Sequence, residues 1–145
     1  MNICKTKENE LNSKPTLSLE DVRNILEAAT NEAAKNNWPV AIALVDDGGH
    51  PLGLIRLDGA APLTSYIATE KARTAALGRR ETKFYEEMIN GGRTSFLSAP
   101  IQGALEGGVP VLVDGQVVGA VGVSGVKSDQ DAQVARAGIA ALDLN

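Results

Sequence analysis

The sequence predicts an α/β protein of the α+β type, in which helices cover both faces of a central antiparallel sheet. Two hairpin signals predict the sheet, and helical periodicity in the segments around them predicts the covering layers. Because 145 residues suffice for one domain with its own core, we divide the chain into a flexible N-terminal tail at 1–16 and a single domain at 17–145.

The domain begins with a helix and a hairpin. Ser18 and Asp21 form a capping pair at the start of the helix. One apolar stripe follows at helical spacing, made of Leu19, Val22, Leu26, Ala29 and Ala33. The continuous apolar run at 40–45 predicts a strand buried on both faces. The turn at 46–49 and a second strand at 50–57 complete the hairpin.

The middle of the chain predicts two helices and a loop. Pro62 is a good first residue for a helix that runs to about Arg80. Its inner stripe is alanine, which allows close packing on a neighbour: Ala68, Ala72, Ala75 and Ala76. Thr82 can cap a shorter helix at 83–89, and 93–103 is mostly loop with one helical turn.

A second hairpin spans 109–124 around Asp114-Gly115, a pair typical of a type I′ turn. One face of its second strand carries Val117, Val121 and Val123. The opposite face is mostly small and carries Val118, Ala120, Gly122 and Ser124. Glycine in a strand marks close approach by another backbone or a ligand. We therefore expect a helix of the same chain, a partner subunit or a flat ligand on this face.

Ser128 is expected to cap the last helix, with Asp131 in the reciprocal position. Helix polarity explains acids such as Asp129 and Asp131 at this place, and a metal role is the alternative. The order of elements suits a three-layer α/β/α sandwich resembling profilin or PAS domains.

Composition excludes several classes of function. The net charge is −4 and no basic cluster stands apart from acids, which argues against nucleic-acid binding. The chain has no long apolar segment, so we expect no membrane span, and it has no secretory h-region, so we expect a cytoplasmic protein. The single cysteine, Cys4, excludes an intramolecular disulfide and a cysteine-rich metal site. We predict no metal site.

Candidate ligand-binding residues gather around the first hairpin, although the chain has no catalytic motif. His50 is the sole histidine, either incidental or a ligand to metal or haem iron. Asp58 and Gly59 lie just before the start of the next predicted helix. There Asp58 either fixes the turn or belongs to an anion-binding site. In the second case Arg56 and two residues of the next helix, Lys71 and Arg73, would pair with carboxylates such as haem propionates.

Five segments in order resemble one known family. They are RLDGA at 56–60, KARTAA at 71–76, GGVPV at 107–111, GQVVGAVGVSG at 115–125 and DQDAQVARAG at 129–138. Together they resemble the GlcG/HbpS-like family, which includes the C-terminal domain of PduO-type proteins and OrfY-type proteins. The match covers about 17–142. The resemblance implies a profilin-like fold with a five-stranded antiparallel sheet and assembly into even-numbered homo-oligomers, often octamers. It also implies haem binding or breakdown in some members and links to cobalamin metabolism in others.

The expected function is therefore a cytoplasmic, oligomeric tetrapyrrole-binding module for haem or a corrinoid, accessory to cobalamin-dependent diol or glycerol metabolism. His50 is the axial candidate, and the carboxylate-binding residues are those named above together with Asp58 and Gly59. Two alternatives stay open. One is a structural oligomeric partner without a ligand. The other is an enzyme of glycolate-type small-metabolite metabolism, with Asp58 and Lys71 in acid–base roles.

Overall fold

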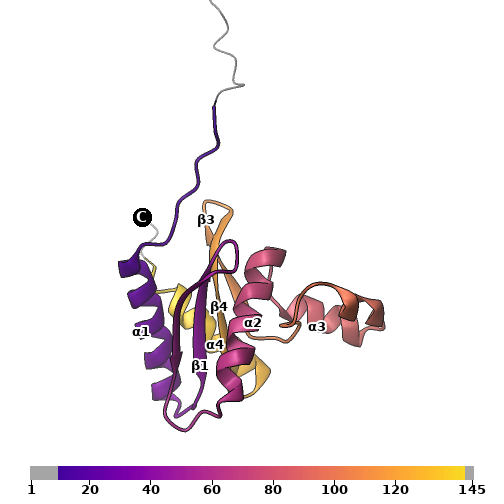
Figure 1. The fold of residues 1–145 in the computed structure, drawn as a ribbon. Helices are drawn as coiled ribbons and strands as arrows, with labels where there is room; N and C mark the ends of the chain where they lie inside the picture. Colours follow the sequence, from indigo (N-terminus) through magenta and orange to yellow (C-terminus); the bar gives the residue numbers. More distant parts are fainter. Residues whose placement is uncertain (1–9, 143–145) are drawn as a thin grey trace, which may run out of the picture.

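The computed structural model describes residues 10–142 (Figure 1). Its elements, in chain order, are α1 (Leu19–Lys35), β1 (Ala41–Asp46), β2 (Pro51–Arg56), α2 (Leu63–Gly78), α3 (Lys83–Asn90), the 3₁₀ helix η2 (Thr94–Ser98), β3 (Gly108–Val113), β4 (Gln116–Ser124) and α4 (Ser128–Ile139). Cys4 and most of the tail predicted at 1–16 lie outside the described residues, as do 143–145. None of the helices described here has both the length and the apolar character that crossing a bilayer requires.

The sheet within residues 10–142 has four strands in the order β2-β1-β4-β3, and neighbouring strands are antiparallel. The expectation of five strands is wrong, because the two hairpins supply two strands each and the other described segments form helices, turns and loops. β1 is central and its apolar run is buried, as predicted. β2 is a mostly exposed edge strand, which explains why it tolerates Pro51.

Helices cover both faces of this sheet (Figure 1), which confirms the layered α/β/α arrangement. α1 and α4 cover one face over a core of large aliphatic side chains that includes Ile25, Leu44 and Val123. α2 covers the other face, where its alanine stripe meets small side chains of the sheet. These sheet residues are Ala41, Ala43, Val45 and Ala120. The alanine stripe therefore brings α2 close to the sheet, as the sequence predicts.

The small face of β4 is contacted at short range by α2 of the same chain. A Cβ atom added at Gly122 would lie only 2.1 Å from the carbonyl oxygen of Ala68. Of the three bodies expected on this face, the helix of the same chain is the one the structure places there.

A β-bulge in β4 reverses the predicted direction of two side chains. Leu112 pairs with Val117, and the next pair along the ladder omits Val118. Val118 is therefore the extra residue of the bulge and joins Val121 and Val123 in the core under α1 and α4. The sequence pattern predicts Val117 there and Val118 on the opposite face, and the bulge makes both assignments wrong.

Of the three predicted helix caps, one is confirmed. Ser18 and Asp21 form both hydrogen bonds of a capping box. Thr82 instead turns inward, is fully buried, and accepts a hydrogen bond of 2.8 Å from the Gly108 amide. Ser128 is the first residue inside α4 and not its cap. For Thr82 the prediction missed contacts with the distant segment 105–108, whereas α4 is capped locally at Lys127, whose amide donates to Gln130 Oε1 at 3.3 Å.

Candidate functional site

The structure distributes the six predicted ligand-binding residues over three places. Lys71 lies in the protein interior, at 3% exposure. Arg56, Asp58 and Gly59 lie at and just beyond the end of β2, and all three are exposed. His50 lies at the other end of the same strand, in the β1–β2 turn, and Gly49 of this turn lies beside the remaining residue, Arg73 of α2.

Lys71 is held in a buried ion pair. Its Nζ lies 3.1 Å from Asp131 Oδ2 and donates a 2.9 Å hydrogen bond to the Val123 carbonyl, while the Val126 amide donates to Asp131 Oδ1 at 3.1 Å. Both charged side chains are 4% exposed. Burial raises the pKa of Asp131 above its ordinary value of 3.8, and the Lys71 ammonium opposes that rise. The pair joins α2, β4 and α4, so Lys71 is closed off from any ligand at the surface.

The end of β2 forms an exposed corner. Gly59 has φ +87°, a conformation that favours glycine, and the hollow beside Asp58 contains the half-buried Trp38. α2 begins after Pro62, four residues beyond Asp58. Because Lys71 is buried and Asp58 is exposed, the structure does not bring these two residues together as an acid–base pair.

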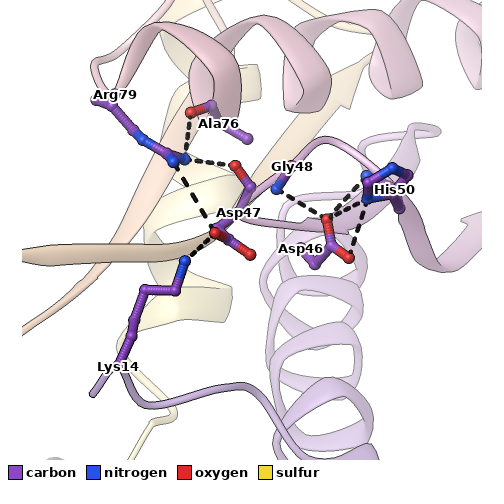
Figure 2. Close-up of polar contacts among 7 residues, drawn as sticks. All are labelled: Lys14, Asp46, Asp47, Gly48, His50, Ala76 and Arg79. Carbon is purple, nitrogen blue, oxygen red and sulfur yellow. Dashed lines mark hydrogen bonds and ion pairs between the residues drawn. The ribbon is translucent and has the colours of Figure 1, made fainter. Parts of the chain in front are cut away.

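The β1–β2 turn orients His50 through Asp46 (Figure 2). Asp46 Oδ1 accepts hydrogen bonds of 2.9 Å from the backbone amides of Gly48 and His50. The His50 Nδ1 atom lies 3.1 Å from the same oxygen and 3.3 Å from Oδ2. Burial raises the pKa of Asp46, but the hydrogen bonds from His50 and Gly48 outweigh it, so the pKa falls below its ordinary value. The carboxylate is therefore a stable partner for the imidazole.

This contact selects the ring nitrogen that can meet a ligand. The His50 side chain is 78% exposed, and with Nδ1 facing Asp46 the Nε2 atom is the one available to an external group. Metal-bound histidines commonly have their other ring nitrogen on a carboxylate, which fixes the ring and strengthens the ligand. The donor chemistry of this turn thus fits an iron atom that takes one axial imidazole.

Two side chains of α2, Arg73 and Leu77, lie beside Gly49 of the turn. A Cβ atom at Gly49 would lie 3.5 Å from Arg73 Cγ and 3.6 Å from Leu77 Cγ. Arg73 and Leu77 also line a cavity of about 430 Å³, together with Glu70 and segment 97–102. Arg73 donates to both Glu70 carboxylate oxygens, at 3.0 and 3.1 Å, across one turn of the helix. This volume is typical of small-molecule sites, but the residues that line the cavity include none of the β1–β2 turn.

Sequence reasoning missed the contact of Asp46 with His50 and assigned Asp131 to a helix cap instead of the buried pair with Lys71. For Asp46 a signal existed, because an aspartate two residues before a glycine and four before a histidine can accept their amides in a tight turn. For Asp131 the partner is 60 residues away in sequence, and its position at a helix start offered a sufficient local explanation.

Comparisons with known proteins agree with this fold. The model of the family described as "Haem degrading protein HbpS-like" matches residues 17–140. Protein GlcG of Escherichia coli K12 is 60% identical over 114 residues, which is 79% of this chain and 85% of GlcG.

Two solved structures extend the likeness. A complex of PduOC with haem has a TM-score of 0.80 and 28% identity, and the match covers 90% of this chain and 98% of that one. A double mutant of Streptomyces reticuli HbpS has a TM-score of 0.83 and 34% identity, over 93% of this chain and 92% of that one. The family match over most of the chain, the GlcG likeness and the shared fold lead to one conclusion: this chain belongs to the HbpS-like family.

Proposed function

We propose that this protein binds haem at the β1–β2 turn, with His50 Nε2 as the axial donor and Arg73 as a partner for a haem carboxylate. The likeness to a solved haem complex over nearly its whole chain is the observation that carries the proposal. The local support is the Asp46–His50 contact, which gives the imidazole a fixed direction on an exposed surface.

The surroundings of His50 suit an amphipathic ligand. Haem has a broad apolar face and two carboxylates at one edge. Leu77, which is 48% exposed, offers apolar surface beside Gly49, and Arg73 offers a guanidinium that can bind a carboxylate. We place this protein in the cytoplasm, and we regard a corrinoid as the alternative tetrapyrrole.

We also propose that the protein assembles into an even-numbered homo-oligomer such as an octamer. Exposed apolar side chains on the α2 side support this: Leu54 is 51%, Leu63 64% and Tyr66 73% exposed. Leu54 and Tyr66 line one hollow, and contiguous exposed apolar surface is typical of protein contacts. Sedimentation of the purified protein tests the assembly, and a single monomeric species would contradict it.

Titration with hemin tests the proposed site. We expect the wild type to give a shifted Soret band at micromolar protein and the His50→Ala variant to lose it or to bind at least about tenfold more weakly. Arg56→Ala is the matched control, because Arg56 lies at the opposite end of β2 and is also exposed. A wild type that does not shift the Soret band, or an Arg56→Ala effect equal to that of His50→Ala, would contradict the proposed site.

Two further measurements separate the alternatives. Titration with hydroxocobalamin in place of hemin tests whether the protein binds a corrinoid. A spectral change that depends on His50 would make the corrinoid the proposed ligand. A protein that binds neither tetrapyrrole but sediments as a defined oligomer would fit the structural partner without a ligand.

A further inference from the structure

Asp47, the residue beside the carboxylate that orients His50, is contacted by two cations from distant parts of the chain (Figure 2). Lys14 Nζ forms an ion pair and hydrogen bond with Asp47 Oδ2. Arg79 Nη2 lies 3.9 Å from the same carboxylate oxygen, and Arg79 Nη1 donates a hydrogen bond to the Asp47 backbone carbonyl.

The two cations come from different elements. Lys14 belongs to the segment before α1, and Arg79 follows the last turn of α2. Arg79 has φ 58° and donates a 2.9 Å hydrogen bond to the Ala76 carbonyl, so its guanidinium is held over the end of α2. Asp47 therefore ties the β1–β2 turn both to α2 and to the N-terminal segment at 10–17.

These contacts act on orientation more than on stability. The side chains of Lys14, Asp47 and Arg79 are 41%, 29% and 50% exposed, and exposed ion pairs contribute little to folding. The turn, in contrast, has only four residues between the end of β1 and the start of β2, so holding one of them restricts the directions that His50 can take. The hydrogen bond from Lys14 lowers the pKa of Asp47, and the contact therefore persists in mild acid.

We propose that Asp47 is a positioning residue for His50, and that segment 10–17 acts through Lys14 as a strap that keeps the turn in its binding geometry. The effect on ligand binding rests on the proposed haem site. The effect on the turn does not, because the strap orders the turn whether or not a ligand is bound.

Hydrogen exchange on the full-length, ligand-free protein tests the geometric part. In Asp47→Asn and in Lys14→Ala, amides of the β1–β2 turn are expected to exchange at least about threefold faster, while those of α1 and α4 keep their rates. Lys35→Ala is the matched control, since Lys35 pairs only weakly with Glu32 at 3.9 Å on α1. Lys14→Arg, which keeps the cation, is expected to restore slow exchange.

Hemin titration of the same variants tests the consequence. We expect Asp47→Asn and Lys14→Ala to weaken binding about three- to tenfold, with an altered Soret maximum and an unchanged thermal midpoint. Unchanged exchange at the turn would overturn the strap, whatever the ligand. Faster exchange with unchanged hemin affinity would overturn the positioning role and leave the haem site standing. A wild type that binds no hemin would overturn the haem site and with it the positioning role, while faster exchange would still support the strap.

Discussion

Gly122→Ala is expected to lower the free energy of unfolding by about 3 kcal/mol, and Gly122→Val is expected to leave no folded protein. A Cβ atom at this position would lie 2.1 Å from the Ala68 carbonyl oxygen and 2.5 Å from the Ala72 amide nitrogen. Both atoms belong to the backbone of α2, so no side-chain rotation can relieve the overlap. α2 would have to move away from the sheet and lose the contacts of its alanine stripe.

Urea unfolding of Gly122→Ala measures this loss, and Gly115→Ala is the control. Gly115 lies in the hairpin turn of the same strand pair with φ +75°, and within residues 10–142 an added Cβ would meet no heavy atom within 4 Å beyond those of Gly115 and its chain neighbours. Its substitution should therefore cost only the conformational penalty, about 1 kcal/mol. Equal effects at the two positions would show that α2 does not approach β4 as closely as the structure has it.

The Gly122 geometry also shows what a sequence can predict about a small-residue face. The pattern of Ala120 and Gly122 indicated correctly that something packs closely on β4, but it left a helix, a subunit and a ligand as candidates. Local spacing says how much room a neighbour has and does not say which neighbour fills it. Gly122 therefore belongs to the monomer core, and its substitution should disturb folding before it disturbs assembly.

Elements with a local cause were predictable. The turn at Asp114 and Gly115 has the positive φ values, 50° and 75°, that the Asp-Gly pair requires, and the Ser18 capping box follows from residues three apart. The bulge at Val118 was not predictable, because it depends on how β3 and β4 align along their whole length. The fifth strand was expected from the resemblance alone and had no segment of its own in the sequence.

The candidate site also combines features with a local cause, which were predictable, and features that depend on distant parts of the chain, which were not. His50 was identified because the chain has one histidine, and Asp46 could have been added from the turn sequence. Two placements depend on where α2 lies against the sheet. Arg73 lies beside the turn that carries His50, and Lys71 is buried in the core. The contact of Gly49 with Arg73 and the buried Lys71–Asp131 pair decide these placements. Neither contact produces a periodic pattern in the sequence.

Lys71→Met is expected to lower the free energy of unfolding by about 3–5 kcal/mol near neutral pH, because it leaves the Asp131 carboxylate buried without its cation. Of its side-chain hydrogen bonds to the described residues, Asp131 would keep only the one from the Val126 amide. Urea unfolding measures the loss. Lys35→Met is the matched control, because Lys35 is an exposed lysine and its substitution should change the stability by less than about 0.5 kcal/mol.

The double variant Lys71→Met with Asp131→Leu separates the charge from the packing. Removing both partners leaves no unpaired ion in the core, so we expect it to recover more than half of the loss. A double variant as unstable as the sum of the two single variants would show that the ammonium and the carboxylate act independently, which a separation of 3.1 Å in the protein interior does not allow.

The pH dependence of Lys71→Met follows from the direction of the Asp131 shift. Burial already raises the pKa of Asp131 in the folded protein above 3.8, and without the opposing ammonium the folded-state pKa rises further. A carboxyl group with a raised folded-state pKa favours folding when protonated, and this contribution is lost as the pH rises through that pKa. The deficit of Lys71→Met relative to the wild type should therefore be smaller at about pH 5 than at about pH 7. A deficit that grows on acidification would mean that Asp131 is stabilised as a carboxylate by groups other than Lys71, and that the buried pair is not what joins α2 to α4.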